Sequence, residues 1–119
     1  MKLRHNLESS DQRIEKILAI KDTLDLITGK WKVLIVFTLL RNGKMRFTAL
    51  KKALNGIASK KLSSDLKDLE INKLIDRKIV KSKPITVEYS ITEHGRSLDN
   101  LISALMNWGL NHRKEIIKN

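Results

Sequence analysis

Residues 56–75, GIASKKLSSDLKDLEINKLI, form a helical pattern whose two sides differ in chemistry. Leu62, Leu66 and Leu69 fall within a narrow arc of a helical wheel, which predicts a helix over roughly 59–72 with one buried face. The opposite side carries lysines and serines, whereas Asp65 falls near the inward arc and Glu70 at its edge. Lysine and serine side chains can contact phosphates and base edges, while carboxylates would be repelled. The pattern therefore favours a recognition helix, although an ordinary solvated amphipathic helix would look similar.

The positive charge of the chain is confined to its middle. The 119 residues have a formal net charge of +11, from 24 Lys/Arg and 13 Asp/Glu. Residues 30–83 contain 15 of the basic and 4 of the acidic residues, so this segment carries the whole +11 and the remainder nets to zero. Because a charge confined to one segment produces a directed field, we expect a polyanionic partner, nucleic acid ahead of membrane. A merely solvated basic surface is the alternative.

The segments around this helix have their own periodicities and stop signals. The expected elements are a helix over 11–28, an apolar helix over 30–42, an extended link over 44–47, a brief helix over 47–54, two extended runs over 74–80 and 85–91, and a last helix over 93–118 that Thr92 caps. Gly29 and Gly43 are expected helix stops. In the brief helix, the inward residues should be Phe47, Leu50, Ala53 and Leu54. The order predicts a mainly α fold with a small β-hairpin wing, a winged helix-turn-helix, in a single domain over 1–119.

Several other classes of protein fit the sequence poorly. There is no cysteine, so disulfides, thiolate metal sites and thiol nucleophiles are excluded. The N-terminus lacks the apolar segment of a signal peptide, and the longest apolar run, 33–40, is far shorter than the ~20 residues of a membrane span. His5, His94 and His112 have no metal-ligand spacing. We therefore expect a cytoplasmic protein that is not an enzyme and has no metal, cofactor or membrane partner.

The charge pattern and the predicted fold together indicate which residues would contact double-stranded DNA. The predicted major-groove residues lie on the recognition helix: Ser59, Lys60, Lys61, Ser63, Ser64 and Lys67. The predicted backbone contacts, several of them in the wing, are Arg46, Lys51, Arg77, Lys78, Lys81 and Lys83. Two alternatives remain open at this stage, a nucleic-acid binder without sequence preference and a winged-helix module that binds an acidic protein.

Five stretches together resemble the HxlR-type branch of the MarR-like winged-helix transcription regulators. They are LDLITGKWKVLIVFTLL (24–40), GKMRFTALKKAL (43–54), the opening stretch (56–75), PITVEYSITEHGRSL (84–98) and LMNWG (105–109). The resemblance implies a regulator, more often a repressor, that binds a pseudo-palindromic operator as a homodimer. Residues 30–91 would then form the DNA-binding core, and 11–28 with 93–118 would pair the subunits.

The resemblance also implies which side chains would form the dimer interface. These are Ile14, Ile17, Leu18, Leu98, Leu101, Ile102, Leu105 and Trp108. The stripe from Leu98 to Leu105 and Trp108 could equally belong to the core of one chain. A small apolar effector could bind between the dimer helices, but no residue demands one.

The sequence departs from the family pattern at four points. Many relatives carry a cysteine near the N-terminus, and its absence rules out thiol switching here. Ala58 replaces the serine that usually caps the recognition helix, a loss of about 1 kcal/mol unless Ser59 takes over. Lys73 replaces the glycine after that helix, so we expect Asn72 to take the left-handed conformation. Pro84-Ile85 replaces the usual Pro-Pro of the wing, which suggests a looser tip.

Overall fold

The computed structural model describes residues 9–118, so His5 lies outside the described residues. The elements, in chain order, are α2 (Ser10–Ile27), α3 (Trp31–Asn42), β1 (Met45–Arg46), α4 (Phe47–Ala53), α5 (Ser59–Ile71), β2 (Ile75–Val80), β3 (Thr86–Ile91), α6 (Glu93–Arg96) and α7 (Leu98–Ile117). The order and the bounds agree closely with the sequence prediction. The fold is a winged helix-turn-helix, mainly helical with a small sheet.

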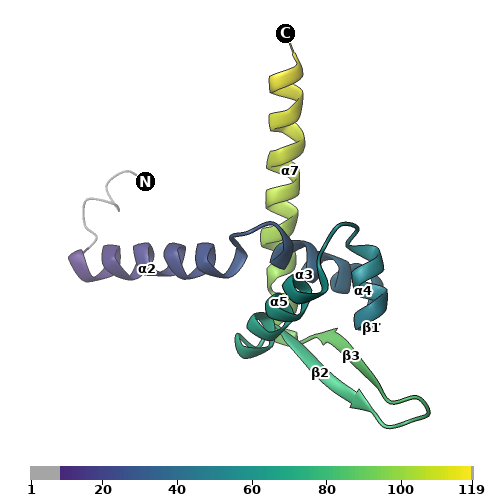
Figure 1. Cartoon of the computed structure of the whole chain (residues 1–119). Coiled ribbons are helices and arrows are strands. Elements are labelled where there is room, and N and C mark those ends of the chain that lie inside the picture. The colour runs from purple at the N-terminus through teal and green to yellow at the C-terminus, as the bar shows by residue number, and fades with distance from the viewer. Residues whose placement is uncertain (1–8, 119) are drawn as a thin grey trace.

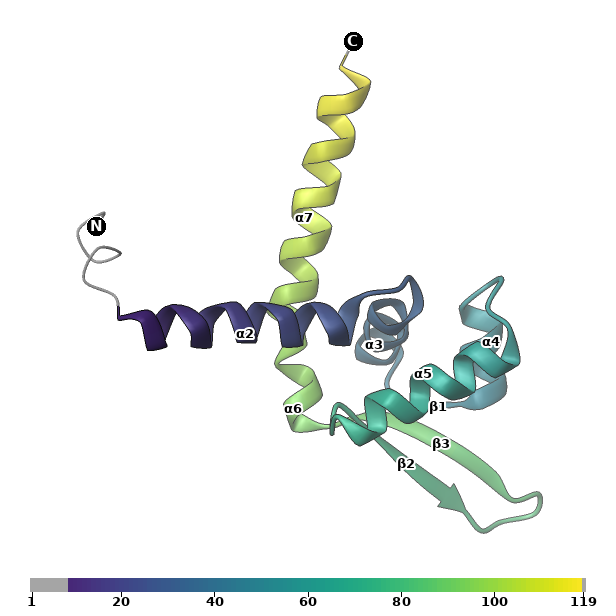
Figure 2. The same cartoon turned by 60° about the vertical axis from the view of Figure 1, so that its left-hand side comes forward.

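The molecule consists of a packed centre from which three parts project. Figure 1 shows α7 rising from the centre, α2 extending to one side, and the hairpin of β2 and β3 extending in a third direction. Figure 2 confirms that α2 and α7 leave the centre in different directions and that α6 joins β3 to α7. The principal extents are 63 × 43 × 22 Å and the radius of gyration is 18.0 Å. A compact domain of this length has a radius of gyration of about 13–14 Å, so the arms make the chain unusually extended.

The hydrophobic core is built chiefly by α3 and α5. Leu62, Leu66 and Leu69 of α5 are buried, as their spacing predicted. The other buried apolar residues are Ile35, Val36, Leu39, Leu50, Leu54, Ile57, Leu74, Ile75, Tyr89 and Ile102. The prediction for Ala53 is wrong, because its side chain is exposed at the end of α4 and only Leu50 is buried within that short helix.

The sheet has three strands rather than the predicted two. β1 pairs antiparallel with β3, and β3 pairs antiparallel with β2, giving the order β1-β3-β2. Met45 lies opposite Tyr89, and Tyr89 lies opposite Arg77 on the other side. The sequence identified the link before α4 as extended, but two residues carry no periodicity that could reveal a strand partner. β1 ties the start of the helix-turn-helix to the wing.

The chain after α5 turns at a residue that the sequence prediction did not choose. Lys73 has a φ of 62°, whereas Asn72 has a φ of −81° and caps α5 with a side-chain bond from Nδ2 to the Asp68 carbonyl of 2.8 Å. Asn72 was therefore the wrong choice, because its side chain is used in the cap and the reversal comes one residue later. A lysine in the left-handed region is strained, since its Cβ crowds the backbone.

The predicted last helix is in fact two helices, α6 and α7, which meet at Ser97. Thr92 caps α6 as predicted, because its Oγ1 accepts from the Gly95 N–H at 2.9 Å. The Thr92 hydroxyl also donates to the Lys73 carbonyl at 2.7 Å, and the Thr92 N–H donates to the Leu74 carbonyl at 3.1 Å. A side chain at Gly95 would collide with that Leu74 carbonyl, so glycine permits this close approach. These contacts fix α6 and the base of α7 to the end of α5.

Candidate nucleic-acid interface

The helix-turn-helix presents one long polar face to solvent. α4 leads into α5 through a turn in which the Ile57 N–H donates to the Leu54 carbonyl at 3.1 Å. Five of the six predicted major-groove residues are exposed: Lys60, Ser64 and Lys67 lie opposite the buried leucines, Ser63 lies at the margin of that side, and Ser59 is the first residue of the helix. This face is free of cover within the chain, as a helix that enters a groove requires.

The sixth predicted residue, Lys61, has a different environment. Its Nζ lies 3.1 Å from Asp65 Oδ1, an ion pair at i, i+4 spacing on α5. Asp65 is buried with 2% exposure and its Oδ2 has no hydrogen-bond partner, so Lys61 supplies the compensating charge. Lys61 therefore lies on the flank of α5 with its ammonium group engaged inside the chain. The spacing of the two residues was visible in the sequence and would have predicted this pair.

A second ion pair connects α5 to α3. Lys32 Nζ lies 3.2 Å from Asp68 Oδ2, and the lysine side chain is largely covered. Lys32 belongs to the basic segment, but its charge is directed at a carboxylate of the same chain. Nothing in the sequence could have shown this pair, because it depends on how α3 and α5 pack. Both pairs lie on one flank of α5, and the Lys32–Asp68 pair, which joins two helices, helps to hold α5 against α3.

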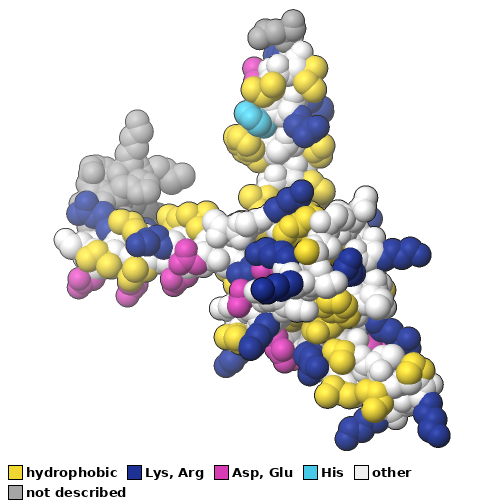
Figure 3. Space-filling view, viewed as in Figure 1, with side chains coloured by type: hydrophobic (Ala, Val, Ile, Leu, Met, Phe, Trp, Pro, Cys, Tyr) yellow, Lys and Arg dark blue, Asp and Glu magenta, His cyan; other side chains and the backbone are white. Residues whose placement is uncertain are grey.

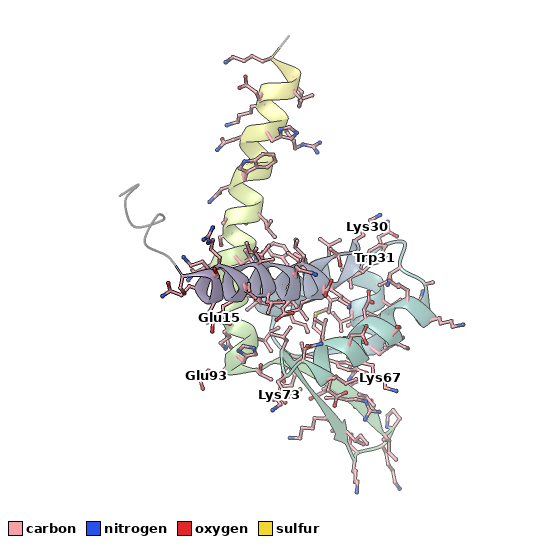
Figure 4. The ribbon with its side chains drawn as sticks, turned by 90° about the vertical axis from the view of Figure 1, so that its left-hand side faces the viewer. Glu15, Lys30, Trp31, Lys67, Lys73 and Glu93 are labelled. Atoms are coloured by element: carbon pink, nitrogen blue, oxygen red, sulfur yellow. The ribbon has the colours of Figure 1, made fainter. Side chains whose placement is uncertain are left out.

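The opposite flank of α5 borders a hollow shared with the wing. Ser63, Lys67 and Glu70 of α5 line it together with Arg77 of β2 and Tyr89 of β3. Figure 4 shows Lys67 extending from α5 beside the hairpin. The hollow brings together three residues that the sequence analysis named separately, Ser63, Lys67 and Arg77. Arg77 offers a phosphate contact in this corner and the Glu70 carboxylate opposes one, while Ser63 and Lys67 stay available for base edges.

The predicted backbone contacts in the wing lie on both faces of the sheet. Alternation along β2 puts Arg77 on the face toward α5 and Lys78 on the other face. Arg46 and Lys78 both lie opposite Glu88, one on each neighbouring strand. Lys81 and Lys83 are exposed at the tip. Figure 3 shows Lys and Arg side chains over α5 and at the end of the wing, and Asp and Glu along one edge of α2.

Two further positions concern the helix-turn-helix itself. Lys51 is exposed in the last turn of α4, apart from the hollow. The N-cap of α5 is Ala58, in extended conformation and without a side-chain hydrogen bond. Ser59 is the first residue of the helix, so it does not take over the missing cap. The N-terminal turn of α5 keeps unsatisfied backbone N–H groups, which is a favourable position for an anion.

The predicted interface residues divide into two groups. Ile14, Ile17 and Leu18 of α2 are about half exposed, and Leu105 and Trp108 of α7 are 44% and 67% exposed. By contrast, Ile102 is buried at 6% exposure and Leu98 packs against the same core. For Leu98 and Ile102 this packing matches the alternative that the sequence left open, a role in the core of one chain. Leu101 is half buried and lines a narrow apolar pocket between α2, α3 and α7.

The described part of the chain contains no group of three or more His, Asp or Glu that could hold a metal ion. Within the same residues, no helix is long and apolar enough to span a lipid bilayer.

Comparison with known proteins shows which family has this sequence and this fold. Residues 26–116 match the family described as HxlR-like helix-turn-helix. The HTH-type transcriptional regulator YdzF of Bacillus subtilis (strain 168) is 44% identical over 88 residues, 74% of this chain and 81% of that protein. The redox regulator HypR in its reduced form superposes with a TM-score of 0.77 at 31% identity, over 85% of this chain and 99% of that one. A transcriptional regulator of the MarR family from Enterococcus faecalis V583 superposes with a TM-score of 0.76 at 31% identity, over 87% of this chain and 94% of that one.

Proposed function

We propose that this chain, which belongs to the HxlR-like helix-turn-helix family of DNA-binding transcriptional regulators, acts as a homodimeric repressor on a pseudo-palindromic operator. Each subunit would insert α5 into the major groove of one half-site. A two-fold dimer implies half-sites about 34–36 Å apart, one helical turn of DNA. Repression is the commoner mode of control that the family resemblance implies.

The observation that carries the proposal is the uncovered face of α5. Lys60, Ser64 and Lys67 are exposed there, whereas the acidic Asp65 and Asp68 are paired with lysines on the flank. The helix thus offers donors to DNA and keeps two of its carboxylates engaged. We assign base reading to Lys60, Ser63, Ser64 and Lys67, and phosphate contacts to Arg46, Lys51, Arg77, Lys78, Lys81 and Lys83. Lys61 is assigned to its ion pair with Asp65 and not to a contact with DNA.

The dimer proposal is supported by the apolar residues that α2 and α7 leave uncovered. Ile17 and Trp108 are 57% and 67% exposed, and each belongs to a longer run of exposed apolar side chains. Large contiguous apolar patches are rare on soluble monomers, so this many exposed apolar side chains on two helices favours a partner. A second copy of the chain would cover them and at the same time set two recognition helices side by side.

The proposal is tested by two substitutions on a duplex that the wild-type protein selects from a random library. Lys67→Ala should weaken binding to the selected duplex much more than to random DNA, because the lost contact is to a base edge. Lys81→Ala should weaken both duplexes similarly and reduce the slope of log K against log salt by about one, since one phosphate contact is lost. Binding is measured by fluorescence anisotropy over a range of salt concentrations.

The same titration distinguishes the alternatives. Steep salt dependence without preference for any duplex would indicate an architectural nucleic-acid binder. Absence of duplex binding at modest salt would indicate a protein-interaction module. Equal effects of the two substitutions on selected and random DNA would remove the division between base reading and phosphate contact.

A further inference from the structure

The exposed apolar stripe of α7 has a titratable residue at its centre. Leu105, Trp108, His112 and Ile116 follow one another every three or four residues, so their side chains share one side of the helix. The three apolar side chains are 44%, 67% and 67% exposed. In Figure 3, hydrophobic side chains and a histidine share the visible side of α7. A partner that covered this stripe would therefore also cover an imidazole.

The imidazole is packed flat against the stripe. The rings of His112 and Trp108 are stacked, with 4.7 Å between their centroids and 20° between their planes. Among the residues that the structure describes, no hydrogen bond or ion pair of the His112 ring accompanies this stack. A ring in this position can join an apolar contact surface as long as it carries no charge.

The protonation state decides whether the ring can be covered. A neutral imidazole has one N–H donor, whereas an imidazolium has a positive charge and two N–H donors. Covering such a charge with apolar surface, without a partner for it, is strongly unfavourable. Histidine is the side chain that ordinarily changes its charge between about pH 5 and 8. The stripe can therefore be covered above this range and resists being covered below it.

The charged groups near the ring are mainly cations. Figures 1 and 2 show the outer half of α7 standing clear of the other elements, so these groups belong to α7 itself. They are Arg113, Lys114 and Glu115, and Glu115 Oε2 lies 4.0 Å from Lys118 Nζ. An imidazolium would add to this local excess of positive charge, and two copies of the helix in that state would repel each other.

A second copy of the chain is the occupant of the stripe that the charges favour. Outside residues 30–83, basic and acidic residues balance, so the terminal helices of two copies carry no net charge that would keep them apart at neutral pH. The positive segment 30–83 is directed at DNA in the proposed function. In a two-fold dimer each copy brings its own His112 to the same interface, so protonation acts twice.

We propose that His112 makes the dimer sensitive to pH: the neutral ring, stacked on Trp108, is covered by the second copy, and its protonation separates the two subunits. The inference rests on the proposed function, because it concerns the homodimer that would bind the operator. The dimer holds the ring without the added proton and the free chain takes the proton up, so dimerisation weakens as the pH falls. A separated subunit could engage only one half-site, so acidification would release the operator.

The test measures the dimer dissociation constant of the full chain by sedimentation equilibrium at about pH 8 and about pH 5.5. The wild-type constant should rise about tenfold for each histidine and about 100-fold per dimer at the lower pH, since about ten protonated rings stand against each neutral one for histidine in water. His112→Phe keeps a stacked aromatic ring without a titrating nitrogen, so its constant should be the same at both pH values. His94→Gln is the matched control, because His94 is exposed on α6, away from the stripe, and this variant should keep the wild-type pH dependence.

A second arm follows the consequence for DNA. Fluorescence anisotropy is measured on the duplex that the wild type selects, at the same two pH values and one salt concentration. The wild type should lose at least tenfold in affinity at the lower pH. His112→Phe should lose distinctly less, because its dimer persists, while His94→Gln should behave as the wild type does.

Several results would overturn the inference while the homodimer stands. These are a wild-type dissociation constant that is the same at both pH values, or the wild-type pH dependence retained in His112→Phe. A dimer that tightens on acidification would mean that a carboxylate of the second copy faces the ring. Circular dichroism at both pH values checks the fold, and loss of the dimer together with the helical signal would also contradict the inference. If the wild type does not self-associate even at about pH 8, the proposed function itself fails.

Discussion

The winged-helix centre and the two terminal helices differ in how they cover their apolar residues. The centre buries its leucines within one chain, so that Leu50 and Leu62 are 0% exposed. α2 contains no buried residue, although Ile14, Ile17, Leu18, Ile20 and Leu24 all lie on it. Most of α7 beyond Ile102 is likewise exposed. The centre buries its apolar residues within one chain, whereas the terminal helices have apolar surface that the chain leaves uncovered.

The same contrast extends to the ends of the helices. The N-terminus of α2 has a full capping box, in which Ser9 Oγ accepts from the Gln12 N–H at 3.1 Å and the Gln12 side chain accepts from the Ser9 N–H at 2.9 Å. α5 has no side-chain N-cap, but four of its residues are buried. A helix without tertiary packing depends on local capping, whereas a packed helix can do without it.

The largest expected effect is in the centre. Leu66→Ala should lower the free energy of unfolding by about 2–5 kcal/mol, because it leaves a cavity between α5 and α3. Chemical denaturation measures the loss. Leu110→Ala is the control, since Leu110 is 54% exposed on α7 and its truncation should change the stability by less than about 0.5 kcal/mol. Similar losses in both variants would show that the two regions do not differ as described.

The next effect concerns the terminal helices. Trp108 is 67% exposed, and its ring stacks on His112 with 4.7 Å between centroids. Trp108→Ala should weaken self-association by about 2 kcal/mol or more, roughly 30-fold in the dimer dissociation constant, since large aromatic residues dominate interfaces. Sedimentation equilibrium gives that constant, and Leu110→Ala serves as the control, because Leu110 follows Trp108 by two residues and so lies on the other side of α7. A wild-type monomer–dimer equilibrium in the Trp108 variant would exclude this part of α7 from the interface.

A smaller effect separates two neighbouring lysines of α5. Lys61→Ala should destabilise the fold by about 1–3 kcal/mol, because the buried Asp65 carboxylate would lose its ion pair. Lys60→Ala should leave stability within about 0.5 kcal/mol of wild type and instead weaken DNA binding. Thermal unfolding measures the stability of the two variants, and fluorescence anisotropy on the same preparations measures their binding to DNA. If Lys60 contributes as much stability as Lys61, the assignment of Lys61 to the fold is wrong.

The smallest expected effect is a gain in stability. Lys73→Gly should stabilise the protein by about 1 kcal/mol, because glycine adopts the positive φ of this position without steric cost. Asn72→Gly, one residue earlier at a negative φ, is the matched control and should destabilise, since it also removes the bond from Nδ2 to the Asp68 carbonyl. The comparison is made by denaturant titration. A loss of stability in Lys73→Gly would mean that the lysine side chain makes a stabilising contact.

Much of the fold could be predicted from local patterns. The leucine spacing of α5, the apolar run of α3, the glycine stop at Gly43 and the Thr92 cap each depend on a few neighbouring residues, and all four are confirmed. The failures involve packing between distant segments. The pairing of β1 with β3 is an example, and the burial of Ile102 concerns a stripe for which the sequence left two roles open. Lys73 is a different case, because a strained conformation contradicts what its side chain prefers.

For the candidate interface, the types of residue and their places along the chain could be predicted without a structure: a basic middle segment, a helix with lysines and serines opposite its leucines, and a lysine-tipped hairpin. Charge and helical periodicity are local properties and can be read along the chain. Which cations are available to a partner depends on how the helices pack, because an ion pair such as Lys32–Asp68 requires two helices to meet. The packing of α5 against the sheet also brings Arg77 and Lys67 into one hollow, which no local pattern could reveal.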